Sequence, residues 1–170
     1  KVVPSKEDAT QHIYQYTSVE ELVMQRLSRW PQEGLEVYRA RYEAPAAALL
    51  DSAKSDDLFA LQKVFTPYFV PDSGTVAGTR LIDHYLEDGE FRAAAATGDR
   101  LPKWHPNILP DRGQLLYRTA IAYHLAGDDA EARQLLSELK KHDPQAKGTV
   151  RGRDVVLADF SAAGLRDSVA

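Results

Sequence analysis

The sequence predicts an all-α fold in which antiparallel helix–turn–helix pairs are stacked as a short solenoid. Apolar residues recur at three- and four-residue spacing along most of the chain, as one face of a helix requires. No stretch shows sustained alternation with a hairpin turn between its halves, which is the pattern of paired strands. In addition, four residues recur at a constant offset of 38 positions, which indicates a repeated structural unit. They are Tyr85, Gly89, Ala94 and Pro106, matched by Tyr123, Gly127, Ala132 and Pro144.

The first 54 residues (1–54) are expected to form an irregular helical region. Ser18 followed by Glu21 is a capping box that starts a helix, and Pro31 ends that helix. The next segment keeps the helical period up to Pro45, where proline removes a backbone donor and clashes with the preceding turn. We therefore expect a kink or a fresh helix start near Pro45.

Residues 55–170 are expected to form the stacked repeats, with a capping helix at the C-terminal end. Asp128 and Asp129 stand where carboxylates complement a helix N-terminus, whereas Lys140 and Lys141 stand where cations complement a C-terminus. Helical spacing and turn residues divide the region into short helices. The expected segments are 55–69, 73–89, 90–101, 110–127, 128–143 and 151–160.

The spacing within the repeated unit describes two helices packed across a tight turn. Each glycine stands where the first helix must stop, a position at which a positive φ is favourable. Each alanine is small enough for the paired helices to approach closely, and each tyrosine fills the space near the turn. Each proline ends the second helix. The repeat is therefore a packing motif and contains no catalytic group.

The second copy resembles the tetratricopeptide repeat, in which large apolar, small and aromatic residues stand at fixed positions before a final proline. The matching residues are Leu116, Ala120, Tyr123, Ala132, Leu136 and Pro144. The two copies depart from that pattern where Thr119 replaces a leucine, Ile82 a small residue and Gly98 a large apolar one. The resemblance implies stacked helix pairs that bind a partner on their concave face.

Most of the chain is also similar to the α-helical region that precedes a pyrroloquinoline-quinone-type β-propeller in large planctomycete proteins. The similarity lies in residues 30–50, 61–91 and 117–160. It implies an exported, extracytoplasmic protein, with an adjacent β-propeller domain of the same chain as one partner. It adds no active site, because the propeller and its chemistry are absent from these residues. The start at Lys1, with neither an initiator methionine nor an apolar signal core, predicts a fragment or processed segment.

The composition excludes several classes of function. A formal net charge of −4 is unfavourable for a nucleic-acid binder, which needs a concentrated basic face. The absence of cysteine excludes disulfides, thiolate catalysis and cysteine-bound metal. No apolar run approaches the roughly 20 residues of a membrane span. We therefore expect neither a nucleic-acid partner nor a membrane-spanning segment.

The usual sequence patterns of enzymes and metal sites are also missing. The five histidines never stand three or four residues apart, which is the spacing of a helix-borne metal site. His84 and Asp88 are expected to form a surface pair. No nucleophile elbow, phosphate loop, dinucleotide fingerprint or zinc-protease motif occurs. We therefore expect a chain that is not an enzyme and has no cofactor and no metal.

A basic cluster near the C-terminal end is expected to be a solvated turn and helix start. Only Asp143 opposes these cations, so the alternative is a surface that meets an acidic partner or a phosphate backbone. The cluster comprises Lys140, Lys141, Lys147, Arg151 and Arg153.

A protein or peptide partner is expected to dock on the first helix of each repeated unit, because these helices line the concave face of such a stack. The predicted groove residues are Thr79, Asp83, Tyr117, Ile121 and His124. Tyrosine and histidine are amphipathic, so the groove suits a peptide or a helix of another domain. The alternative is that these side chains only pack against a neighbouring helix. The expected function is a non-catalytic scaffold for protein–protein or interdomain contacts, with a regulatory or substrate-delivery module and a structural stalk as alternatives.

Overall fold

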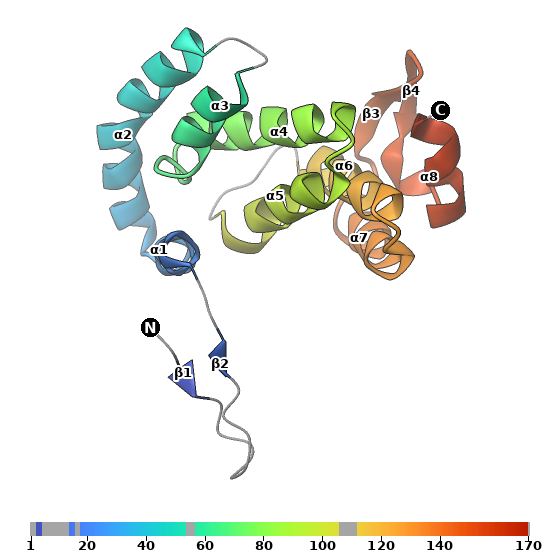
Figure 1. The fold of residues 1–170 in the computed structure, drawn as a ribbon, viewed down its shortest axis with the longest axis horizontal. Helices are drawn as coiled ribbons and strands as arrows, with labels where there is room; N and C mark the ends of the chain where they lie inside the picture. The colour runs from blue at the N-terminus through green and yellow to red at the C-terminus, as the bar shows by residue number, and fades with distance from the viewer. Residues whose placement is uncertain (1–2, 5–13, 16–17, 54–56, 106–111, 170) are drawn as a thin grey trace.

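The computed structural model describes residues 3–4, 14–15, 18–53, 57–105 and 112–169, most of which are helical (Figure 1). From α2 to α7, each helix packs against the next one along the chain. The prediction of a mostly helical fold is therefore confirmed. The helices are α1 (Val19–Leu27), α2 (Gln32–Ser52), α3 (Leu58–Phe65), α4 (Asp72–Glu87), α5 (Phe91–Trp104), α6 (Arg112–Leu125), α7 (Asp129–His142) and α8 (Ala162–Val169).

Two short antiparallel strand pairs accompany the helices. Strands β1 (Val3–Pro4) and β2 (Tyr14–Gln15) pair near the N-terminal end. Strands β3 (Lys147–Val150) and β4 (Arg153–Val156) form a hairpin after α7. A short 3-10 turn, η1 (Leu157–Asp159), connects this hairpin to the segment that leads into α8.

At the N-terminal end, the start of α1 agrees with the sequence prediction, whereas no new helix starts at Pro45. The Ser18 Oγ accepts a hydrogen bond from the Glu21 N–H at 3.1 Å, so the predicted cap of α1 is confirmed. Helix α2 runs through Pro45 as one helix of 21 residues, so the expected fresh start is wrong. Proline removes the donor for the carbonyl four residues earlier, which belongs to Arg41. Because both residues are exposed, water can hydrogen-bond that carbonyl, and the helix continues.

The carboxylate of Glu43 ties α2 to the start of α4. Pro71 precedes α4 and provides no side-chain cap, so the first N–H groups of this helix need another acceptor. Glu43 accepts hydrogen bonds from the Asp72 N–H at 2.7 Å and from the Ser73 N–H at 3.1 Å. The dipole of α4 also favours a negative charge at this end. The contact holds α2 across the N-terminus of α4.

The repeated sequence forms two helix–turn–helix units, α4–α5 and α6–α7, whose turns share the same hydrogen bonds. The glycine of each turn adopts a positive φ, 78° in the first and 87° in the second, as predicted. The Glu90 N–H donates to the Tyr85 carbonyl, and the Asp128 N–H donates to the Tyr123 carbonyl, both at 2.8 Å. Each bond spans five residues, as in the Schellman motif that ends helices. The repeat in sequence is therefore also a repeat of backbone geometry.

The alanines of the repeated unit also take their predicted positions. Ala94 and Ala132 both have an exposed fraction of 0%, which allows the helices of each unit to approach closely. Pro144 follows the end of α7, where it was expected. Pro106 lies outside the described residues.

Two residues that depart from the repeat pattern lie in contact where α5 packs on α6. A Cβ atom built on Gly98 would lie 2.2 Å from Thr119 Oγ1 and 2.9 Å from Thr119 Cβ. Thr119 is fully buried, and its hydroxyl donates to the Leu115 carbonyl at 2.8 Å. The glycine therefore makes room for the threonine, and the two departures compensate each other.

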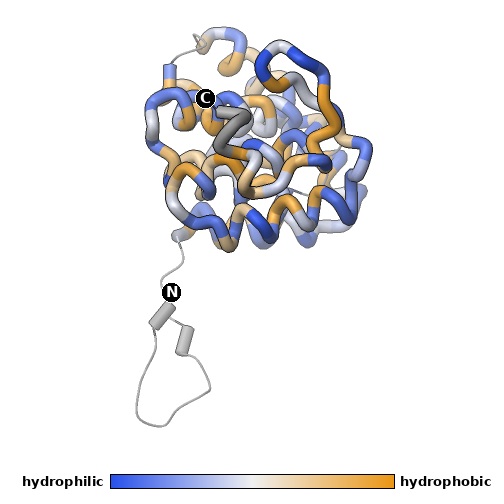
Figure 2. The backbone as a smooth tube through the Cα atoms, turned by 90° about the vertical axis from the view of Figure 1, so that its right-hand side faces the viewer, coloured by the Kyte–Doolittle hydropathy of each residue, from blue (hydrophilic) through white to orange (hydrophobic). Residues whose placement is uncertain are grey.

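The apolar side chains form two clusters that meet on α6. The first extends from α1 to α6. It includes residues on both sides of the boundary predicted at residue 54, so the N-terminal region and the repeats share one core. The second joins α6, α7, the hairpin and α8. Leu115 and Ala122 of α6 belong to the first cluster, whereas Leu116 and Ala120 belong to the second. Figure 2 shows hydrophobic and hydrophilic residues alternating along the helices, which is how each helix supplies one face to a core.

The segment 151–160 was expected to be helical, and this expectation is wrong because it forms β4 and η1. Arg151 and Gly152 adopt positive φ values of 50° and 73°, which suit the two-residue turn between β3 and β4. Val150, Val155 and Val156 are half-buried, and β-branched side chains favour such a surface. The C-terminal helix that packs on α6 and α7 is α8, formed from later residues.

Candidate functional site

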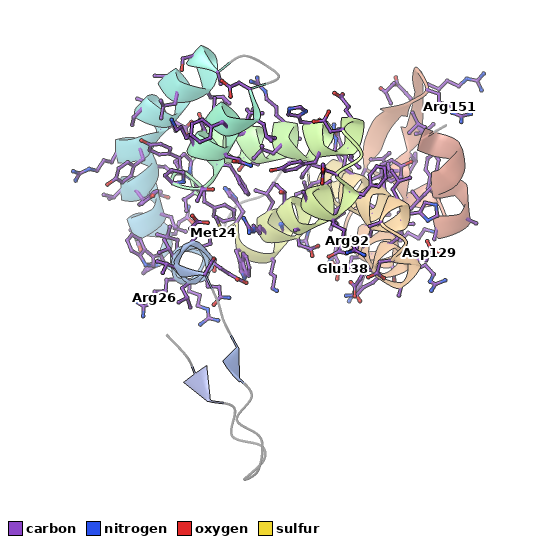
Figure 3. All side chains as sticks on the ribbon, viewed as in Figure 1. Met24, Arg26, Arg92, Asp129, Glu138 and Arg151 are labelled. Carbon is purple, nitrogen blue, oxygen red and sulfur yellow. The ribbon has the colours of Figure 1, made fainter. Side chains whose placement is uncertain are left out.

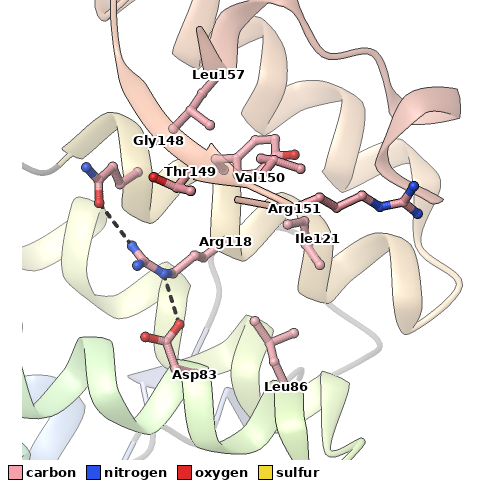
Figure 4. Close-up of a pocket in the computed structure, with 11 residues that line it drawn as sticks. Asp83, Leu86, Arg118, Ile121, Gly148, Thr149, Val150, Arg151 and Leu157 are labelled. Atoms are coloured by element: carbon pink, nitrogen blue, oxygen red, sulfur yellow. Dashed lines mark hydrogen bonds and ion pairs between the residues drawn. The ribbon is translucent and has the colours of Figure 1, made fainter. Parts of the chain in front are cut away.

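A cleft of about 280 Å³ lies between α4, α6 and the β3–β4 hairpin (Figure 4). Leu86 of α4 and Ile121 of α6 give it an apolar surface, and Asp83 and Arg118 add charge. Strand β3 forms the wall opposite α4. Figure 3 shows Arg151 at the tip of the hairpin, at the outer end of this wall. The cleft thus combines apolar, charged and backbone groups, which is the composition of a binding site rather than of a core.

An ion pair and a glutamine connect the three walls of the cleft. The Arg118 Nε lies 2.9 Å from Asp83 Oδ1, and its Nη1 donates to Gln114 Oε1 at 3.4 Å. The Gln114 Nε2 in turn donates to the Lys147 carbonyl of β3 at 3.2 Å. Burial raises the pKa of Asp83 above its usual value, and the neighbouring Arg118 opposes that rise. This chain of contacts holds the Arg118 guanidinium in a fixed position inside the cleft.

The structure places Asp83, Tyr117 and Ile121 of the predicted groove residues in the lining of this cleft. Asp83 and Ile121 are partly exposed there. Tyr117 is only 5% exposed, and its ring centroid lies 5.3 Å from that of Phe160. Tyr117 therefore lines the cleft with a small part of its surface only, while most of its ring packs in the second core cluster, as in the alternative given for these side chains.

The other two predicted groove residues do not line the cleft. The Thr79 hydroxyl donates to the Thr75 carbonyl at 3.0 Å within α4. The His124 Nδ1 lies 2.6 Å from Asp129 Oδ1, beside the turn between α6 and α7. The structure therefore does not bring the five predicted residues together at one site.

The hairpin wall of the cleft was missed by the sequence analysis. Thr149 and Arg151 line it, although their segment was assigned to a turn and a helix. A signal was present, since Arg151 and Gly152 separate two short runs that contain valine. A glycine preceded by arginine is a weaker hairpin signal than Asn-Gly, which is the usual type I′ pair.

A second pocket of about 540 Å³ lies where α5 meets the α6–α7 turn, and Asp99 and Tyr123 line it. The Tyr123 hydroxyl donates to the Asp99 carboxylate. Burial raises the pKa of Asp99, and the hydrogen bond from Tyr123 opposes that rise. Burial, and then the bond to Asp99, also raise the pKa of Tyr123, so its hydroxyl stays protonated and donates. The pair joins α5 to α6.

The described residues lack the features of a metal site and of a membrane span. Within the described ranges, no group of three or more histidine, cysteine, aspartate or glutamate residues could hold a metal ion. In the same part of the chain, no helix is both long and apolar enough to cross a bilayer. The surface pair predicted for His84 and Asp88 is confirmed, with 3.3 Å between Nδ1 and Oδ2.

Comparison with protein-family models, with curated proteins and with solved structures finds no match to this chain.

Proposed function

We propose that this chain is a non-catalytic helical-repeat scaffold of the tetratricopeptide type. It binds a peptide segment, supplied by a partner protein or by an adjacent domain such as a β-propeller, in the cleft between α4, α6 and the hairpin. The function is to hold that segment in place, without turnover of a substrate. An extracytoplasmic location accompanies this proposal through the sequence resemblance alone.

The observation that carries the proposal is the position of the cleft on the repeated units. Helices α4 and α6 are the first helices of the two units, and both contribute to its lining. The identical hydrogen bonds of the two turns support a stack of tetratricopeptide-like pairs. Repeat proteins change partners through exposed residues of these helices while their packing residues stay constant.

The chemistry of the lining suits a peptide. Leu86 and Ile121 offer apolar contact beside the Arg118 guanidinium, and arginine is enriched where proteins bind one another. A cleft of about 280 Å³ is at the small end of ligand clefts, so a few side chains are enough to fill it.

The experiment is selection of a phage-displayed random peptide library on the purified chain, followed by affinity measurements on the enriched peptides. We expect Ile121→Glu to weaken their binding by about tenfold or more, because a charge replaces an apolar contact. A tenfold loss of affinity corresponds to about 1.4 kcal/mol. Val76→Glu is the matched control, since Val76 is a 42% exposed valine of α4 that does not line the cleft. Circular dichroism must show that both variants remain folded.

Two outcomes would contradict the proposal. One is a library that yields no specific peptide on the folded chain. The other is a set of peptides that bind the Ile121→Glu and Val76→Glu variants equally well, which would place their site elsewhere.

A further inference from the structure

One wall of the cleft is the edge of β3 that pairs with no other strand among the described residues. Val150 pairs with Arg153 across the two-residue turn, and Gly148 pairs with Val155. In such a hairpin these are the hydrogen-bonded pairs, so the N–H and C=O groups of Lys147 and Thr149 point away from β4.

The contacts of β3 show which way this edge faces. The Lys147 carbonyl accepts the hydrogen bond from Gln114 of α6, so the outward groups of β3 are directed toward the helices. Thr149, the next residue with outward backbone groups, lines the cleft. Among the described residues, none hydrogen-bonds to the N–H or C=O of Thr149. The cleft therefore presents a backbone donor and acceptor beside an apolar surface.

We propose that the segment bound in the cleft is an extended, acidic peptide that pairs with β3 as a third strand. This inference rests on the proposed function and specifies its ligand. Strand addition at an exposed edge uses backbone hydrogen bonds for affinity and alternate side chains for specificity.

The two faces of β3 define the side chains that such a strand carries. A Cβ atom on Gly148 would lie 2.9 Å from Leu157 Cδ2, so this face of β3 packs on the second core cluster. Side chains of the added strand on this face meet Leu86 and Ile121, which favours apolar residues. Lys147 and Thr149 are exposed on the opposite face. The peptide therefore alternates apolar residues with polar ones.

The charges near the edge of β3 favour acidic residues at the polar positions of the peptide. Lys147 of β3 and Arg151 of the turn are exposed at this edge. The nearby carboxylates already have partners, since Asp83 pairs with Arg118 and Asp154 of β4 accepts a hydrogen bond from the Thr149 hydroxyl. Opposite charges on neighbouring strands stabilise a sheet, and like charges destabilise it. The same rule disfavours a second copy of this chain, because two β3 edges would bring their basic residues together. Lys147 and Arg151 of the basic cluster thus favour an acidic partner.

The direct test uses an eight-residue peptide that alternates valine and glutamate, compared with the same peptide carrying lysine in place of glutamate. We expect the glutamate peptide to bind the full chain at least about tenfold more tightly, a difference of about 1.4 kcal/mol. Methylation of single backbone nitrogens along the peptide should weaken binding at alternate positions only, because every second N–H of an added strand points at β3.

Charge reversal on the hairpin provides the second arm. Arg151 has a φ of 50°, a conformation that asparagine and aspartate tolerate, so both substitutions leave the turn intact. Arg151→Asp should weaken binding of the glutamate peptide by about tenfold and strengthen binding of the lysine peptide. Arg151→Asn is the neutral control, and its affinities should lie in between.

Different failures have different meanings. If library-selected peptides bind the cleft but methylation shows no alternation, the peptide does not add to β3 and this inference is wrong, while the scaffold proposal stands. If the glutamate and lysine peptides bind equally, the acidic specificity is wrong. A dimer in size-exclusion chromatography with light scattering, abolished by Thr149→Pro, would assign the edge to a second copy instead. If no peptide binds at all, both proposals fail.

Discussion

Replacing Gly98 with alanine tests the close contact between α5 and α6. The new Cβ would lie 2.2 Å from Thr119 Oγ1, and rotation of the threonine gives no relief because its own Cβ is only 2.9 Å away. The two helices must therefore separate, in a region where Thr119 is fully buried.

The expected magnitude follows from two opposing effects. An extra methyl group in a packed interface costs about 1–3 kcal/mol, and a contact this short belongs at the upper end. Alanine in place of glycine within a helix recovers about 1 kcal/mol. We expect a net loss of about 2 kcal/mol in the free energy of unfolding. This corresponds to a melting temperature lower by about 4–8 °C for a chain of this size.

The assay is urea unfolding followed by circular dichroism, with Gly34→Ala as the matched control. A Cβ on Gly34 of α2 would be no closer than 3.5 Å to any neighbouring side chain, so this variant should be as stable as the parent or more stable. Combining Gly98→Ala with Thr119→Ala should show favourable coupling of about 0.5–3 kcal/mol, because the shortest contact disappears. A Gly98→Ala variant that is stabilised like Gly34→Ala would refute the close approach of α5 and α6.

Three further predictions concern stability. Glu43→Ala should lower the free energy of unfolding by about 1.5–3 kcal/mol, since it removes charged hydrogen bonds at the start of α4, and Glu43→Gln should cost less; urea unfolding measures both. Asp99 has a raised pKa in the folded chain, so its contribution to stability is complete below its unfolded pKa and is lost as pH rises through the folded pKa. The stability of Asp99→Asn relative to the parent should therefore increase as the pH rises from below the ordinary aspartate pKa of about 4 through the raised folded pKa, and then stay constant; a difference that is flat with pH would contradict this. Tyr117→Ala should lower the free energy of unfolding by about 3–5 kcal/mol because the ring is buried, whereas His124→Ala should lower it by less than about 1 kcal/mol. Thermal melts of the two single variants distinguish a core residue from a surface residue.

The parts of the fold that the sequence predicted correctly depend on local rules. The glycine turns, the cap at Ser18 and the buried alanines each follow from the conformation or size of one residue type. The continuation of α2 through Pro45 depends instead on whether water reaches one carbonyl, which spacing along the chain does not specify. The pairing of Gly98 with Thr119 depends on two helices meeting, so each residue alone looked like a departure from the repeat.

The candidate site was predictable only where it lies on the repeated helices. Asp83 and Ile121 were identified because their helical positions place them on one face of the stack. The hairpin wall was not, because a two-residue turn with arginine in its first position is hard to distinguish from a helix start. The burial of Tyr117 was not predictable for a related reason, since the Phe160 ring that packs on it follows the missed hairpin.

Because α6 supplies side chains to both apolar clusters, we expect the two halves of the molecule to open together. In many repeat proteins each unit contacts only its neighbours, and the ends fray while the middle stays folded. Here, loss of the hairpin and α8 would expose Leu116 and Ala120 on the same helix whose opposite side holds Leu115 and Ala122. The amide protons of α4 and α6 should therefore exchange with solvent through a common global event. A chain shortened after Gln145 should lose that protection throughout its N-terminal helices as well.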